Sequence, residues 1–235
     1  MNAALLLSGG IGSRAAARIP KQYIRAGEYM IVTYALIPLL SVERIDQVCI
    51  VAGKEWQQSI LEEADRVGLD TDKIKGFAEP GENRQYSIYH GLQAIQKWNS
   101  DKELNSITVL IHDAARPSLS EKLIMDCYAA LEEHDGVMPV LPMKDTVYYS
   151  SDGRRAEKLL DRSCIFAGQA PELFRLDKYI KANESLLPEK ILKVNGSAEP
   201  AVLAGMDIVM IPGDETNQKI TTDEDLKQFQ KRFAI

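Results

Sequence analysis

Short apolar runs alternate with longer amphipathic segments along most of this chain. The runs are rich in aliphatic and β-branched residues and are apolar on both faces. They are Ala3–Ser8, Gln47–Ala52, Ile74–Phe77, Ile107–His112, Val137–Leu141 and Met206–Ile211. Runs of this kind are typical of strands in a sheet that is covered on both sides. We therefore expect them to form one central sheet.

Between these runs, apolar residues recur at helical spacing. The helices predicted in this way are Glu55–Gly68, Arg84–Trp98 and Glu121–Glu133. Alternating strands and helices of these lengths are typical of βαβ units with a parallel sheet. The chain has no internal repeat, low-complexity tract or long linker. The pattern predicts a single α/β domain over residues 1–235, with a mostly parallel sheet.

One region breaks this alternation. Asp145–Tyr149 and Leu159–Phe166 are typical of two strands around a turn at Asp152-Gly153. A hairpin that pairs only with itself is marginally stable, and its apolar side chains would be left in water. Two interpretations remain: an arm at about 145–168 that packs on another subunit, or a surface hairpin folded back on its own domain.

Composition narrows the classes of function. The chain is 45% hydrophobic and 26% charged, with a net charge of −6. An acidic balance argues against a broad nucleic-acid surface, although a small anionic ligand needs only a local cluster of cations. No apolar run approaches the ~20 residues of a membrane helix, and no basic leader precedes the first strand. We expect a cytoplasmic protein without a membrane partner.

The cysteines point to no special chemistry. Cys49, Cys127 and Cys164 each lie in or beside an apolar stretch, and no CxxC pair is present. We interpret them as buried reduced thiols and find no sign of a zinc site.

The glycine-rich segment after the first strand, "SGGIGSR", has several interpretations. Gly10, Gly12 and Ala15 satisfy a dinucleotide-binding G-x-G-x-x-A pattern, but Pro20 interrupts the long helix that this pattern requires. A Walker A loop fails, because Ser13-Arg14 follows Gly12 where Lys-Ser/Thr is needed.

A third interpretation is a loop for a nucleoside triphosphate. Glycines let backbone N–H groups face phosphate oxygens, and cations flank the segment at Arg14 and Lys21. A plain strand–helix turn with these two side chains in solvent remains the alternative on this segment alone.

Two further segments carry candidate chemistry. "IHDAARP" ends an apolar strand at Asp113, at the sheet edge where open α/β folds bind ligands, and a carboxylate there can hold Mg²⁺ against phosphates. The alternative is an Asp that caps a turn. "NQKITTDEDL" places Lys219 after an apolar strand and before a helix that begins at Thr222. The alternative is a solvated lysine beside a helix cap.

Taken together, these segments resemble a known family. "SGGIGSR", "PKQY", "GENRQYSIYHGL", "HDAARP", "KDT", "LDR" and "NQKIT" occur in the order and spacing of the 2-C-methyl-D-erythritol 4-phosphate cytidylyltransferases. Ribitol 5-phosphate cytidylyltransferases are near relatives of that family. The resemblance spans the chain from Ala3 to Leu226.

The resemblance implies a Rossmann-like nucleotidyltransferase fold and the transfer of CMP from CTP to a small polyol phosphate, with release of pyrophosphate. It implies CTP as substrate, Mg²⁺ as cofactor and a homodimer joined by the hairpin arm. Of the two branches, "HDAARP" and "NQKIT" look more like the methylerythritol phosphate branch, which supplies isoprenoid precursors.

The same resemblance implies roles for individual residues, carried over position by position. Catalytic roles fall to Arg14, Lys21 and Lys219, and metal binding falls to Asp113. Nucleotide binding falls to Ser8, Gly9, Gly10, Gly12, Gly81, Arg84, Ser87 and Ala114. Acceptor binding falls to Arg116, Thr146 and Arg162. These residue types suit the reaction, because the acceptor phosphate is already a nucleophile and needs charge neutralisation and positioning rather than a base. His112 is accordingly interpreted as strand-end packing.

Two segments depart from the family pattern, and both belong to its acceptor side. The family usually has Gln-Thr-Pro-Gln where this chain has Gln169-Ala170-Pro171-Glu172, and an acidic Thr-Asp-Asp or Thr-Asp-Glu where this chain has Asn195-Gly196-Ser197. Ala170 lacks a hydroxyl that could donate and accept hydrogen bonds. Other classes remain as alternatives: an NAD(P)-dependent oxidoreductase, or a nucleotide-binding protein without catalysis.

Overall fold

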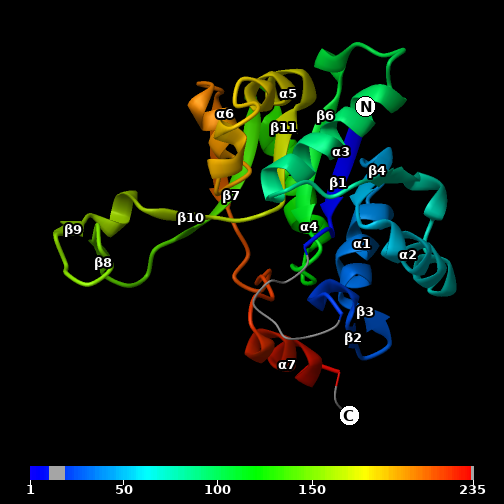
Figure 1. The fold of residues 1–235 in the computed structure, drawn as a ribbon, viewed down its shortest axis with the longest axis horizontal. Helices are drawn as coiled ribbons and strands as arrows, with labels where there is room; N and C mark the ends of the chain where they lie inside the picture. Colours follow the sequence, from blue (N-terminus) through cyan, green and yellow to red (C-terminus); the bar gives the residue numbers. More distant parts are fainter. Residues whose placement is uncertain (11–18, 234–235) are drawn as a thin grey trace.

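A computed structural model describes residues 1–10 and 19–233 of the chain. Eight strands form one sheet in the order β10-β7-β11-β6-β1-β4-β5, with β12 also paired to β7 (Figure 1). These strands are β1 (Asn2–Leu7), β4 (Gln47–Val51), β5 (Ile74–Ala78), β6 (Thr108–Asp113), β7 (Gly136–Pro142), β10 (Phe166–Gly168), β11 (Glu172–Arg175) and β12 (Ile208–Pro212).

One half of this sheet is parallel, as the sequence predicts. β1 pairs in parallel with both β4 and β6, and β4 pairs in parallel with β5. The register sets Leu7 of β1 beside Val51 and Asp113, so these strands end at one common edge. The segments that follow β1 and β6 are thereby brought together.

The other half is mixed. β11 runs antiparallel to its neighbours β6 and β7, β10 is antiparallel to β7, and β12 is parallel to β7. The α/β class is confirmed. The sheet is less parallel than the pattern predicts, because the antiparallel strand β11 was not predicted from the sequence. At four residues, β11 is too short to show a period of its own.

Helices cover both faces of the sheet and produce two core clusters. On one face lie α1 (Ile31–Ser41), α2 (Lys54–Arg66) and α4 (Glu121–Leu131); on the other lie α3 (Arg84–Trp98), α5 (Leu176–Glu184) and α6 (Glu199–Leu203). Both faces of β1 are therefore buried, which explains its unbroken apolar run. A last helix, α7 (Asp223–Lys231), and a two-stranded ribbon of β2 (Arg25–Ala26) and β3 (Tyr29–Met30) lie beyond one edge of the sheet (Figure 1).

Helix α3 has the predicted bounds, and its start has a local cause. The side chain of Asn83 accepts a hydrogen bond from the backbone N–H of Tyr86 at 2.8 Å and so caps the first turn. Helix α1 escaped prediction because most of its residues are buried and it contains Pro38, which leaves no amphipathic period. None of the described helices is long and apolar enough to cross a membrane.

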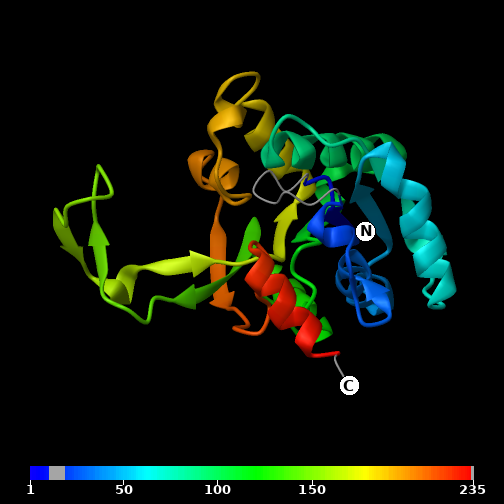
Figure 2. The same cartoon turned by 60° about the horizontal axis from the view of Figure 1, so that its bottom comes forward.

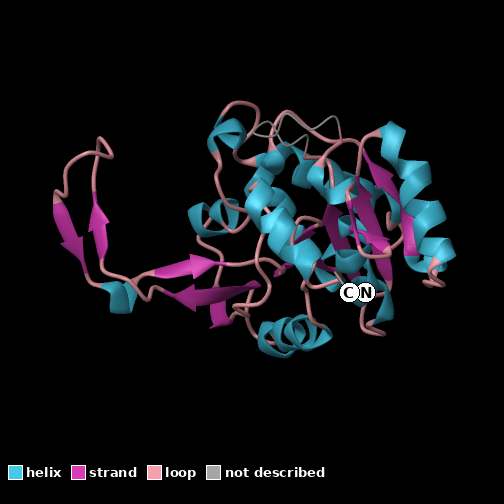
Figure 3. Cartoon of the chain, turned by 90° about the horizontal axis from the view of Figure 1, so that it is seen from below, coloured by secondary structure: helices cyan, strands magenta, loops and turns pink. Residues whose placement is uncertain are grey.

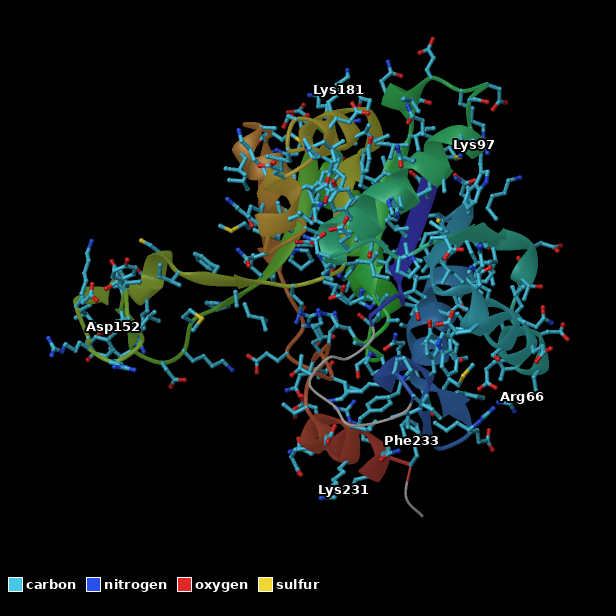
Figure 4. All side chains as sticks on the ribbon, viewed as in Figure 1. Arg66, Lys97, Asp152, Lys181, Lys231 and Phe233 are labelled. Carbon is cyan, nitrogen blue, oxygen red and sulfur yellow. The ribbon has the colours of Figure 1, made fainter. Side chains whose placement is uncertain are left out.

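The region that breaks the alternation is a projecting arm. β8 (Val147–Tyr149) and β9 (Lys158–Leu160) pair as a small hairpin, and Gly153 in the turn has φ +68°. Figures 2 and 3 show the hairpin standing away from the body, and Asp152 marks its far end in Figure 4. The hairpin is confirmed, and within one chain it does not fold back on its domain.

Candidate active site

A cavity of about 410 Å³ lies at the edge where β1, β4 and β6 end. Its walls come from the residues after β1, the start of α2, the loop before α3, and the end of β6. Its lining residues are Leu7–Gly10, Pro20, Gln22, Tyr23, Gly53, Glu55, Trp56, Pro80–Arg84, Ser87, Asp113, Ala115 and Lys219. We refer to it below as the nucleotide cavity, after the role that the sequence predicts for these residues.

The backbone after β1 is held by side chains from the following turn. Gln22 donates from its amide to the carbonyls of Ser8 (2.8 Å) and Gly10 (2.7 Å), and the Tyr23 hydroxyl donates to the Ser8 carbonyl at 2.7 Å. A Cβ on Gly9 would lie 2.7 Å from the Pro80 side chain, so only glycine fits there. This part of the cavity wall is therefore preorganised by buried hydrogen bonds.

Asp113 is the electrostatic centre of the site. Its Oδ1 accepts from Arg84 Nη2 at 2.8 Å and its Oδ2 accepts from Lys219 Nζ at 2.8 Å, while Arg116 Nε lies 4.0 Å from Oδ2. Burial alone would raise the pKa of Asp113, but the charges of Arg84 and Lys219 hold that pKa well below its ordinary value. One buried carboxylate thus gathers three cations that are far apart in sequence.

The loop before α3 forms another wall. Ser87 donates to the Asn83 carbonyl at 2.9 Å and accepts from the Gly81 backbone N–H at 3.0 Å. A Cβ on Gly81 would lie 2.4 Å from Tyr86 Cβ, so the loop approaches the helix too closely for any other residue. Ser87 shapes the loop that faces the cavity through these two hydrogen bonds, which use the one proton of its hydroxyl.

A second cavity of about 420 Å³ opens at the base of the arm, and we call it the acceptor cavity. It is lined by Arg116, Leu141–Lys144, Ala167, Gln169, Glu215, Gln218 and Lys219. Arg116 donates from Nη1 to the Asn217 carbonyl at 2.8 Å, while its buried Nε has no hydrogen-bond partner. Lys219 lines both cavities, and its Nζ is bonded to Asp113.

The turn that presents Lys219 is tied down on both sides. Gln169 bonds through its amide to the backbone of Asp214 and Asn217, and Asn217 donates to the Ala170 carbonyl at 2.8 Å. On the other side, the Ile220 backbone N–H donates to the Ala115 carbonyl at 2.8 Å. Ala170 therefore helps to hold this turn through its backbone carbonyl. That contact is present even though the chain has alanine where the family usually has threonine.

The structure brings most of the predicted residues together, but not all of them. Ser8, Gly9, Gly10, Gly81, Arg84, Ser87, Asp113 and Lys219 line the nucleotide cavity, and Arg116 lines the acceptor cavity. Ala114 is fully buried, and its neighbour Ala115 lines the cavity instead. The predictions for Gly12 and Arg14 lie outside the described residues.

Three predicted residues lie elsewhere. Lys21 is not among the described residues that line the nucleotide cavity; its Nζ donates to the Thr221 carbonyl at 2.8 Å and lies 3.2 Å from Asp223 Oδ1. Thr146 and Arg162 are exposed on the arm, and Arg162 donates to the Lys144 carbonyl at 2.6 Å. Neither of these two residues is among those that line the acceptor cavity, although Arg162 contacts Lys144, which does line it.

Sequence reasoning also missed residues that shape the site. Tyr23 and Trp56 stack with ring centroids 4.2 Å apart and both line the nucleotide cavity. Glu172 is buried without a partner for Oε2, and burial raises its pKa to about 7 against the opposing charges of Arg84 and Arg116. Only the tertiary contacts distinguish these residues from ordinary core positions, although Tyr23 is the last residue of the "PKQY" motif.

His112 behaves as the sequence predicts. It is fully buried, burial lowers its pKa to about 4, and Nε2 pairs with the Arg116 carbonyl at 3.0 Å. Because a carbonyl only accepts, the neutral ring carries its proton on Nε2. His112 supports the backbone of Arg116 and lines neither cavity.

The donors present fit a magnesium ion that is held mainly by a substrate. No group of three or more His, Cys, Asp or Glu side chains in the described part of the chain could hold a metal alone. Asp113 nevertheless offers an ionised carboxylate, and Mg²⁺ is typically bound by one or two carboxylates together with substrate phosphates and water. The site thus supplies an anchor rather than a complete cage.

Comparison with known proteins places these features in a family. The chain matches the family described as 2-C-methyl-D-erythritol 4-phosphate cytidylyltransferase (IspD) over residues 3–232. It is 32% identical, over 95% of its length, to the 2-C-methyl-D-erythritol 4-phosphate cytidylyltransferase of Rubrobacter xylanophilus, of which it covers 90%. It is also 26% identical, over 99% of its length, to the ribitol-5-phosphate cytidylyltransferase of Streptococcus agalactiae, of which it covers 95%.

Other relatives are longer or share the fold alone. The bifunctional enzyme IspD/IspF of Maricaulis maris is 29% identical over 98% of this chain, and the chain spans 57% of that relative's length. The crystal structure of 4-diphosphocytidyl-2C-methyl-D-erythritol synthase from Anaerococcus prevotii superposes with a TM-score of 0.81 at 24% identity, covering 98% of this chain and 95% of the other. The α/β fold with its mixed sheet and small hairpin is therefore shared.

Proposed function

The chain belongs to the 2-C-methyl-D-erythritol 4-phosphate cytidylyltransferase (IspD) family, and from that premise we propose that the acceptor to which it transfers CMP is 2-C-methyl-D-erythritol 4-phosphate. Membership in the family makes the chain a cytidylyltransferase that uses CTP and a polyol phosphate. The observation that carries this choice of acceptor is that "HDAARP" and "NQKIT" look more like the methylerythritol phosphate branch than the ribitol branch. Lys219, which lines both the nucleotide and the acceptor cavity, fits cytidylyl transfer to either acceptor.

In this proposal CTP occupies the nucleotide cavity. The backbone at Ser8–Gly10 faces the phosphates, and the Gly81 loop held by Ser87 faces the base. Arg84 and Lys219 are placed by Asp113 to neutralise charge that develops on the reacting phosphates. Arg14 and Lys21 add cations from the glycine-rich segment.

The acceptor occupies the cavity at the base of the arm. Arg116 lines this cavity, and a guanidinium group there can pair with a phosphate oxygen. The acceptor phosphate oxygen attacks the α-phosphorus of CTP, the new P–O bond forms, and the bond to the bridging oxygen breaks to release pyrophosphate. No general base is required, because the nucleophile is already ionised.

Mg²⁺ fits the carboxylate of Asp113. When bound there, it would neutralise part of the charge on the substrate phosphates. Asp113 keeps its ionised form through its contacts with Arg84 and Lys219. Those two side chains also hold the carboxylate in a fixed orientation at the end of β6.

The site is completed, in this proposal, by a homodimer. Thr146 and Arg162 lie on the arm and are not among the residues that line the acceptor cavity of their own chain. Tyr148, Tyr149, Leu159 and Phe166 on the same arm are between 41% and 62% exposed. An apolar arm of this kind favours association, and a two-fold arrangement would deliver its polar residues to the partner's cavity.

The test is a comparison of acceptors. The protein is incubated with CTP, MgCl₂ and either 2-C-methyl-D-erythritol 4-phosphate or ribitol 5-phosphate, and pyrophosphate release is measured. We expect kcat/KM to favour the methylerythritol substrate by tenfold or more, about 1.4 kcal/mol in transition-state binding. A preference of that size for ribitol 5-phosphate would overturn the acceptor and leave the cytidylyl transfer intact.

Ribitol 5-phosphate is the second candidate for a specific reason. Ala170 and Asn195-Gly196-Ser197 depart from the usual methylerythritol pattern. Ribitol-5-phosphate cytidylyltransferases match over the whole chain at 26% identity. A site built on hydrogen bonds strongly rejects an acceptor that lacks a matching hydroxyl, so the two substrates should separate clearly.

A further inference from the structure

Lys21 occupies an unexpected position for a residue that belongs to a phosphate site. Its neighbours Pro20 and Gln22 both line the nucleotide cavity, whereas the Lys21 side chain is turned to the start of α7. That side chain is only 12% exposed. Its position is therefore built by packing and polar contacts rather than left to solvent.

The partners of Lys21 are themselves held in place. The Asp225 carboxylate accepts from the backbone N–H groups of Thr221 and Thr222 at 2.9 and 2.7 Å, and the Thr222 hydroxyl accepts from the Asp225 N–H. This capping box fixes the direction of the Thr221 carbonyl, which accepts a hydrogen bond from the Lys21 ammonium group. Asp223 in the first turn of α7 then adds a carboxylate 3.2 Å from Nζ.

A triphosphate in the adjacent cavity competes for the same ammonium group. It carries more negative charge than one carboxylate, and Asp223 is 74% exposed, so its hold on Lys21 is weakened by solvent. Movement of Lys21 to the phosphates requires the contact with Asp223 to break. The free energy of that contact is subtracted from the free energy of nucleotide binding.

We propose that Asp223 is a positioning residue that holds Lys21 against α7 until CTP binds, and that it thereby lowers the affinity of the nucleotide cavity. The proposal rests on the proposed place of CTP in that cavity. In this proposal the start of α7 binds the Lys21 ammonium group while the cavity is empty. The same short segment of the chain also carries Lys219. Release of Lys21 and occupation of the cavity are then one coupled event.

The experiment measures the dissociation constant of CTP with MgCl₂ by titration calorimetry, without acceptor. Asp223→Ala is expected to bind CTP about two- to fivefold more tightly than the wild type, the range for a partly exposed ion pair. Glu224→Ala is the matched control, since Glu224 is an exposed acid in the same helical turn but makes no contact with Lys21 among the described residues. It should leave the constant unchanged.

A double-mutant cycle excludes a general effect on the helix. In a Lys21→Ala background, Asp223→Ala should no longer change the affinity for CTP. Equal affinity of Asp223→Ala and wild type, weaker binding, or the same gain in Glu224→Ala or in the Lys21→Ala background would overturn the proposal. Absence of CTP binding by the wild-type protein would instead refute the proposed function.

Discussion

The nucleotide cavity and the acceptor cavity are nearly equal in volume but are built differently. The nucleotide cavity is formed by strand ends, the start of α3 and the turn at Gln22, all inside one chain. The acceptor cavity lies at the base of a projecting arm, and two of its predicted residues stand on that arm in solvent. The sheet positions the nucleotide cavity, and under the proposed dimer the arm of a second chain would complete the acceptor cavity.

This difference teaches how the two halves of the reaction are positioned. Leu7, Val51 and Asp113 are set side by side by hydrogen-bonded register, which tolerates no gradual displacement. Arg162 is fixed by one hydrogen bond to a neighbouring carbonyl of the same arm. Substitutions in the nucleotide cavity should therefore act within one chain, while substitutions on the arm should act between chains.

The largest effect is expected at the residue that the two cavities share. Lys219→Ala should lower kcat by a factor on the order of 10²–10³, the usual cost of removing one preorganised donor from a developing charge. Initial rates of pyrophosphate release measure it. Lys227→Ala, an exposed lysine on α7, is the control and should retain full turnover. If the turnover of Lys219→Ala stays within a few-fold of wild type, Lys219 does not stabilise the charge that develops in the reaction.

The buried carboxyl of Glu172, which faces the charges of Arg84 and Arg116, should affect the free energy of unfolding. The pKa of Glu172 is raised by burial from 4.5 to about 7, so the folded protein keeps a proton that the unfolded chain loses. Stability should therefore fall as the pH rises from 4.5 to 7. Glu172→Gln should remove this slope and stabilise the protein at pH 8 by up to about 3 kcal/mol.

Denaturant unfolding of both proteins between pH 5 and 8 measures this effect. Glu133→Gln is the control, because Glu133 is an exposed glutamate, and it should leave the pH dependence of stability unchanged. An unchanged slope in Glu172→Gln would show that the charges of Arg84 and Arg116 fully offset the burial of this carboxyl.

The arm provides a sharper test of the comparison. Arg162→Ala should lower kcat/KM for the acceptor by about 10- to 100-fold, the range for a hydrogen bond to a charged group, and leave the affinity for CTP unchanged. Arg154→Ala, nearer the tip of the same arm, should have little effect. A loss of CTP affinity in Arg162→Ala would contradict the separation of the two cavities.

Mixing two inactive proteins then reveals where the arm acts. If the arm of one chain completes the site of another, Lys219→Ala and Arg162→Ala form mixed dimers in which one site carries neither substitution. After exchange of subunits, an equal mixture should recover about a quarter of the wild-type activity, because half of the dimers are mixed and each has one intact site. No recovery after proven exchange would place Arg162 in its own chain's site.

The smallest effect is expected at Ser87. Its hydroxyl holds the Gly81 loop through one donated and one accepted hydrogen bond. Ser87→Ala should weaken CTP binding by about fivefold, equivalent to ~1 kcal/mol, without a change in kcat. Titration calorimetry and steady-state rates measure the two quantities. A fall in kcat alone would show that Ser87 acts on the reacting phosphates rather than on the loop.

The central elements could be predicted from the sequence because their causes are local. The apolar runs Gln47–Ala52 and Ile107–His112 predict strands β4 and β6, and α3 has both an amphipathic period and a capping Asn83. Helix α1 and strand β11 could not be found in this way. The first is buried nearly all round, and the second is too short to have a period, so tertiary contacts decide both.

The sequence by itself determined the identity of the charged residues, their order, and the strand ends on which they lie. The position of Asp113 was enough to predict a carboxylate that holds Mg²⁺ against phosphates, since parallel strands end at one edge of a sheet. The role of Lys219 near the phosphates came from the family resemblance. Only the tertiary structure decided that Lys219 joins two cavities, that Lys21 turns to α7, and that Arg162 stands outside the acceptor cavity of its own chain. The physical reason is that side-chain direction depends on partners distant in sequence. Asp113 with Lys219 and Lys21 with Asp223 meet through contacts that no local pattern contains.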